Sequence, residues 1–147
     1  MGLIQDKWNE GQCRNEDGIF FANDEYIPLF WTASGVEVGE RQTIQNIVHE
    51  HSDGLCNFYA NCECSNEAYL ALGGGGSWEG EGFVALIEKM NHKLMWILHL
   101  QDLEDVDEIV IEGEFIKATA TVYPRHNTLT ISITQPQTVL FDFRYET

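Results

Sequence analysis

The feature of this sequence that most constrains its fold is a regular alternation of apolar and polar residues in the C-terminal third. Residues 116–123 (IKATATVY) alternate in this way, and residues 128–134 (TLTISIT) do so again after the turn-forming residues PRHN. A period of two matches a β-strand, in which successive side chains point to opposite faces. The pattern resumes at 139–145 after a break at 135–137 (QPQ), so we predict a three-stranded meander with one apolar face.

Other segments also favour strands. Residues 108–112 (EIVIE) alternate, whereas residues 94–101 (LMWILHLQ) are apolar on both sides, as expected for a central strand. Residues 20–31 contain strand-like pieces around an Asn-Asp turn. Residues 83–90 fit either a helical stripe or one arm of a hairpin, and their short length and Gly-rich entry favour the hairpin.

One segment favours a helix. Ile44, Ile47, Val48 and His51 have helical spacing ahead of Gly54, which could end the helix. We therefore expect a mainly β fold, either a β-sandwich or an antiparallel meander of about 8–10 strands, with one short helix near residues 41–51. An α+β fold is the alternative. We find no repeat or linker that divides the chain, so residues 1–147 are expected to form a single domain.

The glycine-rich run at 73–82 (GGGGSWEGEG) suggests a surface loop between two strands. It lacks the Lys and Ser or Thr of a phosphate-binding loop, and Glu79 and Glu81 stand where phosphate would have to bind. Trp78 would then either anchor the loop to the core or be exposed to a partner. We include Trp78 among the candidate partner-binding residues.

The charge of the chain bears on its partner. Asp and Glu number 24 and Lys and Arg 8, which gives a formal net charge of −16. Small domains stay soluble with a net charge of magnitude roughly 2–8, and a larger excess opposes compaction by self-repulsion. A dense negative surface attracts a basic partner and accelerates association, but it repels nucleic acid. We therefore expect a basic protein partner and no direct contact with nucleic acid.

The acidic residues are densest between residues 102 and 114. This stretch has no Lys or Arg, and we take its carboxylates as the candidate partner-binding residues: Asp102, Glu104, Asp105, Asp107, Glu108, Glu112 and Glu114. Strand alternation would place Glu108, Glu112 and Glu114 on one face with Val110, and Ile109, Ile111 and Phe115 toward the core. An ordinary solvated face is an equally simple interpretation. Calcium binding is disfavoured because the ligand register of an EF-hand is missing.

Metal binding and catalysis have weak signals. The residues with metal-ligand chemistry are His49, His51, Cys56, Cys62 and Cys64, whose spacing matches neither zinc ribbons nor zinc fingers. Their simplest interpretation is buried thiols near solvated histidines. His99 lies within an apolar strand, where a histidine is usually a hydrogen-bonded structural residue. We find no catalytic motif, so the sequence predicts neither an enzyme nor a cofactor.

Targeting signals are not apparent either. The first residues, MGLIQDKWNE, have no basic and apolar leader pattern, and no window approaches 18 uninterrupted apolar residues. A cytoplasmic protein with reduced thiols and no membrane contact is therefore expected. The oligomeric state stays open.

A small, acidic, strand-rich chain with no catalytic motif resembles bacterial toxin-immunity proteins, including those of contact-dependent inhibition systems. The resemblance concerns general character over the whole chain and the strand pattern between residues 82 and 136, so it transfers no individual residue. It implies that the chain binds a cognate basic toxin, such as a nuclease, over its active site in a stoichiometric complex. The alternatives are a nucleic-acid mimic that inhibits a DNA- or RNA-binding protein, and a metal site or enzyme built from the His49, His51, Cys62 and Cys64 cluster.

Overall fold

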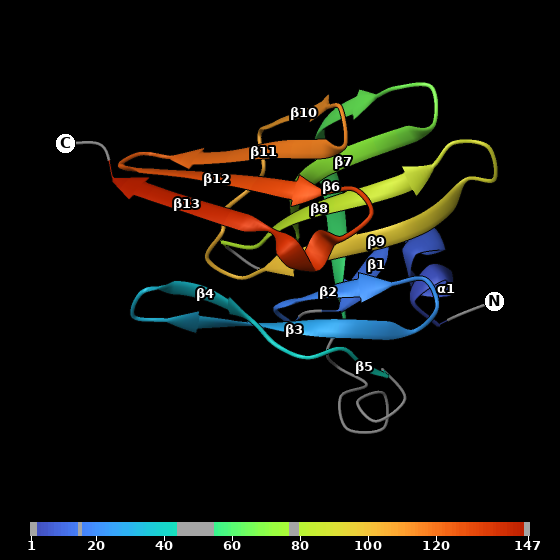
Figure 1. Cartoon of the computed structure of the whole chain (residues 1–147), viewed down its shortest axis with the longest axis horizontal. Coiled ribbons are helices and arrows are strands. Elements are labelled where there is room, and N and C mark those ends of the chain that lie inside the picture. The colour runs from blue at the N-terminus through green and yellow to red at the C-terminus, as the bar shows by residue number, and fades with distance from the viewer. Residues whose placement is uncertain (1–2, 15, 44–54, 77–79, 146–147) are drawn as a thin grey trace.

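The computed structural model of the chain describes residues 3–14, 16–43, 55–76 and 80–145. Within them it is mostly β, with two antiparallel sheets that pack face to face (Figure 1). The expected mainly β fold is therefore confirmed, and its form is a β-sandwich. The α+β alternative is wrong.

The larger sheet has nine strands. Eight of them lie in the spatial order β1-β6-β7-β8-β9-β2-β3-β4, and β5 pairs with β3. Their bounds are β1 Gln12–Arg14, β2 Gly18–Phe21, β3 Glu25–Thr32, β4 Gly35–Val38, β5 Gln42–Thr43, β6 Leu55–Ser65, β7 Tyr69–Gly76, β8 Gly82–Glu88 and β9 Lys93–Leu100.

The smaller sheet has four strands in sequence order, β10 (Glu108–Glu112), β11 (Phe115–Val122), β12 (Arg125–Ser132) and β13 (Leu140–Tyr145), with a 3₁₀ turn η1 (Pro136–Thr138) before the last. The predicted meander is therefore confirmed. Its alternation is also seen in the burial of the side chains, because Ile116, Ala118 and Leu129 are fully buried between the sheets. The pattern fails at two strand ends, where Val122 is 43% and Tyr145 is 70% exposed.

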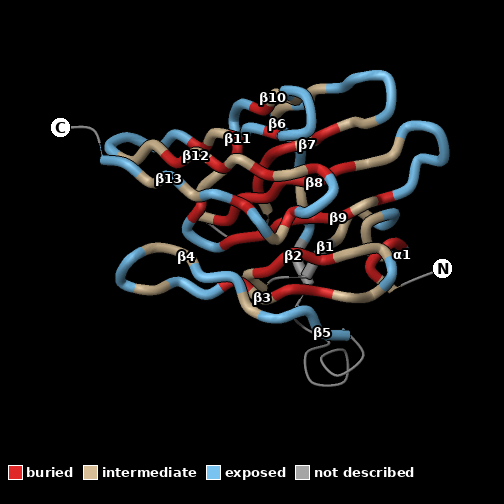
Figure 2. The backbone as a smooth tube through the Cα atoms, viewed as in Figure 1, coloured by how far each residue is buried: buried red, intermediate tan, exposed pale blue. Residues whose placement is uncertain are grey.

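The two faces of the larger sheet bury different clusters. One face packs against the smaller sheet through side chains such as Ile27, Leu98 and Ile131. The other face holds a second cluster that includes Phe20 and Phe83, and α1 (Leu3–Asn9) covers it through Ile4. Figure 2 shows this burial along the middle of the strands, whereas the hairpin tips are exposed. The sheet is thus buried on both faces, which explains the continuous apolar run of β9.

The hairpin expected at residues 83–90 is confirmed, because β8 pairs antiparallel with β9. The expected strands at 20–31 are also present, with β2 and β3 joined by a turn in which Asp24 has φ 67°. Asp is among the few residues that adopt this left-handed conformation without a large cost.

Only the first residues of the helix expected near residues 41–51 are described. Gln42–Thr43 form β5, and residues 44–51 lie outside the described residues. The α-helix in the described part of the chain is α1, which the sequence pattern did not indicate because it makes only two turns. The described residues form 13 strands rather than the expected 8–10, since short strands such as β1 and β5 have too few residues to show a period.

The first four residues of the glycine run at 73–82 form a strand rather than the expected surface loop, and residues 77–79 lie outside the described residues. Gly73, Gly74, Gly75 and Gly76 form the second half of β7, between β6 and β8. Glycine has no side chain and therefore shows no alternation, so a buried glycine strand looks like a loop in sequence.

None of the helices in the described residues has the length and apolarity needed to span a bilayer.

Candidate functional site

The acidic connection between the two sheets packs directly on the glycine strand. Residues 101–107 link β9 of the larger sheet to β10 of the smaller one. Leu103 and Val106 anchor the connection with fully buried side chains. Its backbone is also fixed, because the Val106 N–H donates to the Gly74 carbonyl at 3.1 Å and the Glu104 N–H donates to the Gly80 carbonyl at 2.9 Å.

The glycines are required by this close approach. A Cβ on Gly73 would lie 2.5 Å from Cγ1 of Val106, and a Cβ on Gly75 would overlap the carboxylate of Asp105. Carbon atoms in contact are normally about 3.5–4.0 Å apart. The two unusual features of the sequence, the glycine run and the acidic stretch, are therefore one structural unit.

Some of the carboxylates hold the connection in place. Glu104 forms an ion pair with Arg125 of β12, and Asp105 accepts a hydrogen bond of 2.9 Å from the Tyr59 hydroxyl of β6. This hydrogen bond to Asp105 is the main cause of the raised pKa of Tyr59. Asp107 accepts a hydrogen bond of 3.3 Å from the backbone of β11. These three side chains contribute to the rigidity of the connection, so they are not simply a solvated row.

The other predicted carboxylates face solvent. Asp102, Glu108, Glu112 and Glu114 are exposed, and their side-chain carboxylates have no hydrogen bond or ion pair with the described residues. The acidic residues of this region also affect the Cys62 thiol. Burial is the main cause of the raised pKa of Cys62, and the negative charges of Asp107 and Glu108 raise it further. The connection therefore presents uncompensated negative charge on a fixed backbone.

The expected orientation of Phe115 is wrong. Gly113, at φ 60°, and Glu114 form the turn between β10 and β11, and Phe115 lies directly opposite Glu112. Residues that face each other across two strands share a face of the sheet. Phe115 is thus on the outer face with Glu112 and is 50% exposed, and Ile116 takes its place in the core.

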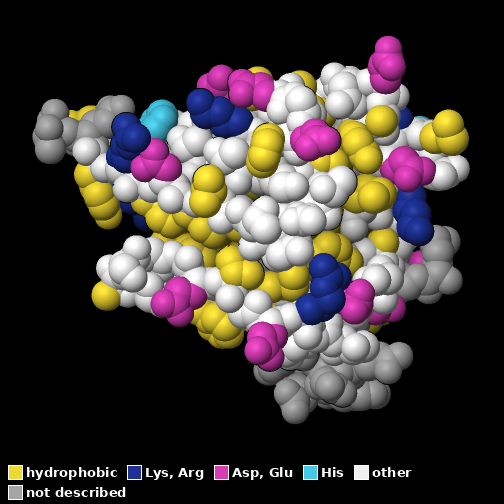
Figure 3. Space-filling model, viewed as in Figure 1, with side chains coloured by type: hydrophobic (Ala, Val, Ile, Leu, Met, Phe, Trp, Pro, Cys, Tyr) yellow, Lys and Arg dark blue, Asp and Glu magenta, His cyan; other side chains and the backbone are white. Residues whose placement is uncertain are grey.

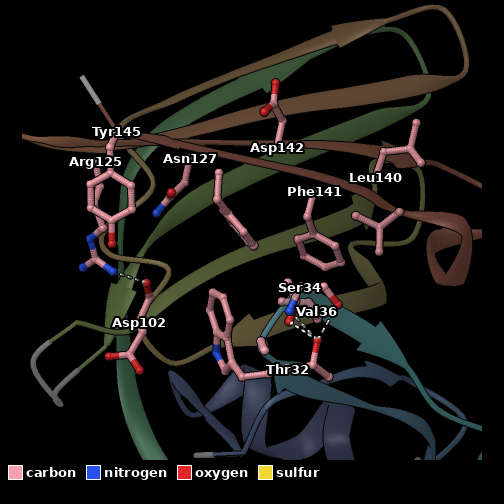
Figure 4. A pocket seen from close by; sticks show the side chains of 15 residues that line it. Thr32, Ser34, Val36, Asp102, Arg125, Asn127, Leu140, Phe141, Asp142 and Tyr145 are labelled. Carbon is pink, nitrogen blue, oxygen red and sulfur yellow. Dashed lines mark hydrogen bonds between the residues drawn. The ribbon is translucent and has the colours of Figure 1, made fainter. Parts of the chain in front are cut away.

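A groove of about 680 Å³ begins at Asp102. It runs between β13 on one side and the β3–β4 hairpin on the other, and the close-up in Figure 4 shows side chains from both entering it. Aromatic rings form much of its wall: the centroid of Phe143 lies 5.1 Å from that of Trp31 and 5.6 Å from that of Phe141. Tyr145 and Arg125, which face each other across β12 and β13, lie at the end nearest Asp102.

The groove meets the acidic connection at Asp102, and we call residues 101–103, with Asp102 at their centre, its floor. The backbone carbonyls of residues 101–103 accept hydrogen bonds from Trp31 Nε1 at 2.9 Å, Arg125 Nη1 at 3.3 Å and Asn127 Nδ2 at 3.0 Å, in that order along the chain. Trp31 belongs to the larger sheet, whereas Arg125 and Asn127 belong to the smaller one. Both walls of the groove are therefore tied to the same three residues.

A further carboxylate lies beneath this floor. Asp17 accepts a hydrogen bond of 2.6 Å from the backbone N–H of Gln101. Burial is the main cause of the raised pKa of Asp17, and the negative charges of Asp102 and Glu81 raise it further. The carboxylates around the floor thus repel one another, which makes this end of the groove favourable for a cation.

Glu81 and His99 form a buried pair close to Asp17. Their side chains are 0% and 1% exposed, and His99 Nε2 lies 3.0 Å from Glu81 Oε1. The other ring nitrogen, Nδ1, lies 2.9 Å from the carbonyl oxygen of Glu16, so it must donate a proton there. The expectation that His99 is a hydrogen-bonded structural residue fits this arrangement, whereas Glu81 is not in a surface loop as expected.

The remaining candidate residues are only partly described. Trp78, His49 and His51 lie outside the described residues. The Cys62 thiol donates toward the Val106 carbonyl at 3.5 Å, and Cys64 Sγ lies 3.3 Å from the backbone nitrogen of β10 residue Ile111. Among the described residues, no three His, Cys, Asp or Glu side chains are placed to hold a metal ion.

The groove was not predicted from the sequence. Its aromatic wall combines Trp31 with Phe141 and Phe143, which come from opposite ends of the chain and from different sheets. The only local signal is that aromatic residues occur beside polar turns at the ends of hairpins.

Comparison of the chain with protein families, curated proteins and solved structures gave no significant match.

Proposed function

We propose that this protein is an immunity-type inhibitor that binds a cognate basic toxin, such as a nuclease, in a stoichiometric complex. The observation that carries the proposal is the acidic connection at 101–107 and the strand that follows it. Its backbone is fixed by hydrogen bonds and by two buried anchors, yet several of its carboxylates have no cation. A preorganised, uncompensated charge favours binding because little conformational entropy is lost when a basic surface docks.

The charge of the whole chain supports the same function. A net charge of −16 opposes folding by self-repulsion, and a basic partner would relieve that repulsion on binding. The positive active site of a nuclease, which must bind phosphates, is a surface of the required chemistry. An inhibitor that covers this site needs no catalytic residue of its own.

A nucleic-acid mimic has less support from the geometry. Glu108 and Glu112 are four residues apart on β10, which corresponds to about 13 Å at roughly 3.3 Å per residue. Phosphates follow each other along a DNA strand about every 3.4 Å of helix axis. Val110 lies between the two carboxylates and faces Lys117 across the sheet, so the row does not repeat like a phosphate backbone.

The test is the kinetics of association with the toxin, which the resemblance places in the neighbouring gene. The Glu108→Lys, Glu112→Lys double variant should associate about tenfold more slowly at low salt, because these charges steer the basic partner. The dependence of its association rate on salt should also be much weaker than that of the wild type. Stopped-flow or biosensor measurements over a range of salt concentrations give both values.

The matched control is the Asp6→Lys, Glu10→Lys double variant. Asp6 lies in α1 and Glu10 directly follows it, and α1 covers the opposite face of the larger sheet. Both pairs of substitutions raise the net charge by four. The control should keep most of the wild-type rate, and thermal melts should show that both variants fold. Equal slowing of the two double variants would contradict a local acidic interface, and no binding of the toxin by the wild type would refute the proposed function.

A further inference from the structure

The groove is bordered by the open edges of two strands. Among the described residues, β13 pairs only with β12, and β4 pairs only with β3. The edge of a sheet has unpaired backbone N–H and C=O groups, to which an extended peptide can add as a further strand. The groove therefore combines a lined cavity with free backbone hydrogen-bonding groups.

The lining of the groove is mixed, and its aromatic side chains favour apolar groups where they lie. Trp31, Phe143 and Phe141 form a continuous row of rings, and Trp31 remains 39% exposed although its indole N–H is hydrogen-bonded. Figure 3 shows hydrophobic side chains along the line between β13 and the β3–β4 hairpin, with acidic side chains around the rim of this face. Alternate side chains of a strand added to β13 would point toward these rings.

The end of the groove at Asp102 favours a cation. Asp102 lines this end with an exposed carboxylate, and Asp17 lies close enough to Asp102 to be repelled by it. Arg125, which also lines it, is engaged by Glu104 and by the Asp102 carbonyl. The ring of Tyr145, which is 70% exposed, lies beside them and could hold a cation against its face. The net charge of −16 also argues against a second copy of this chain as the occupant, because two copies would repel each other.

We propose that the groove binds an extended basic segment of the partner protein, which adds to the open edge of β13. Its alternate apolar side chains pack on Trp31 and Phe143, and an arginine or lysine side chain lies beside Asp102. The proposal rests on the proposed function, since it specifies where and how the basic partner is bound. It is continuous with the acidic connection because Asp102 belongs to both.

The direct test uses a labelled, end-blocked peptide of sequence Arg-Thr-Val-Thr-Val-Thr and fluorescence anisotropy. The peptide should bind, and replacing its arginine by glutamate should weaken binding at least tenfold. Methylation of alternate backbone nitrogens, made in both registers, should abolish binding in one register only, because only one set of N–H groups faces β13. Absence of binding, or equal loss in both registers, would overturn the proposal.

Variants of the protein locate the binding site. Trp31→Ala should weaken binding of the peptide at least tenfold, because aromatic residues at the centre of an interface contribute most to affinity. Asp102→Asn should weaken binding of the arginine peptide about fivefold and leave binding of a peptide with glutamine in place of arginine unaffected. Asparagine also tolerates the left-handed backbone at this position, where φ is 64°. Phe115→Ala removes an aromatic side chain that is 50% exposed outside the groove, and it should bind normally. If Phe115→Ala weakens binding as much as Trp31→Ala, the groove is not the site.

The same variants separate this proposal from the proposed function. If the toxin binds the Trp31→Ala variant as tightly as the wild type, the groove proposal is wrong and the inhibitor function stands. If the peptide binds in the groove but the wild-type protein does not bind the toxin, the proposed function is wrong and the groove proposal stands without it. A faster dissociation of the toxin from Trp31→Ala, together with an unchanged association rate, supports both.

Discussion

Replacing Gly74 by alanine is expected to destabilise the fold by more than about 3 kcal/mol, because the new methyl group would overlap the backbone of the neighbouring strand. A Cβ on Gly74 would collide with the carbonyl oxygen of Tyr59 and lie 2.9 Å from Cα of Ala60. Both atoms belong to the backbone of β6, so they can move away only if β6 and β7 separate. Because domains of this size are stable by about 5–15 kcal/mol, much of the stability should be lost.

Urea unfolding followed by circular dichroism measures this loss. The control is Gly113→Ala, at the turn between β10 and β11, where a Cβ meets no atom within 4 Å. Its φ of 60° alone should cost about 1–2 kcal/mol. If Gly74→Ala is no less stable than Gly113→Ala, the glycine strand does not have the close contact described above.

Replacing Glu81 by alanine is expected to cost about 3–5 kcal/mol, since it leaves a buried imidazole without its partner. His99 Nδ1 donates to the Glu16 carbonyl, so the ring keeps a proton there. The bond between His99 Nε2 and Glu81 Oε1, 3.0 Å long, holds one further proton, carried either by the ring or by the carboxyl group. Removal of the carboxyl group takes this buried hydrogen bond away from Nε2.

Glu81→Gln is the informative control for this pair. Its amide N–H can donate to the unprotonated Nε2 of a neutral His99, so the buried hydrogen bond survives without a charge. We expect this variant to lose only about 1 kcal/mol, in line with a hydrogen bond that is exchanged rather than removed. Denaturant unfolding of both variants at the same pH makes the comparison. Equal and small losses in the two variants would show that the buried pair contributes little.

These two predictions concern one structural unit. The glycine strand makes space on one side for the acidic connection and on the other for the buried carboxylate, because a Cβ on Gly76 would overlap Oε2 of Glu81. Both the acidic surface and the floor of the groove therefore depend on β7. Substitutions in β7 should consequently reduce binding through unfolding, whereas the exposed carboxylates can be changed without loss of stability.

The sequence predicts most of the smaller sheet because its pattern is local. Ile116, Ala118, Leu129 and Ile131 alternate with polar residues, and each is fully buried. The position of each strand in this meander follows from short turns that join consecutive strands. Where the larger sheet has buried residues on both faces, as in β9, period two is absent and only the length of the apolar run indicates a strand.

The sequence does not predict the role of the glycine run, because glycine carries no side chain that would show burial. It also does not separate the carboxylates that fix the connection from those that face solvent. That distinction depends on Tyr59 and Arg125, which lie far from the acidic stretch or on another strand. The groove also depends on residues that are distant in sequence, because Trp31 and Phe143 meet only when the two sheets pack. It was therefore not predicted.

We propose that this protein inhibits a basic toxin by binding it one to one. The most direct measurement is a titration of the proposed cognate toxin, sought in the neighbouring gene, with the purified protein, followed through the catalytic activity of that toxin. We expect a linear loss of toxin activity that is complete at one equivalent. Full toxin activity at a tenfold excess of the protein would contradict it.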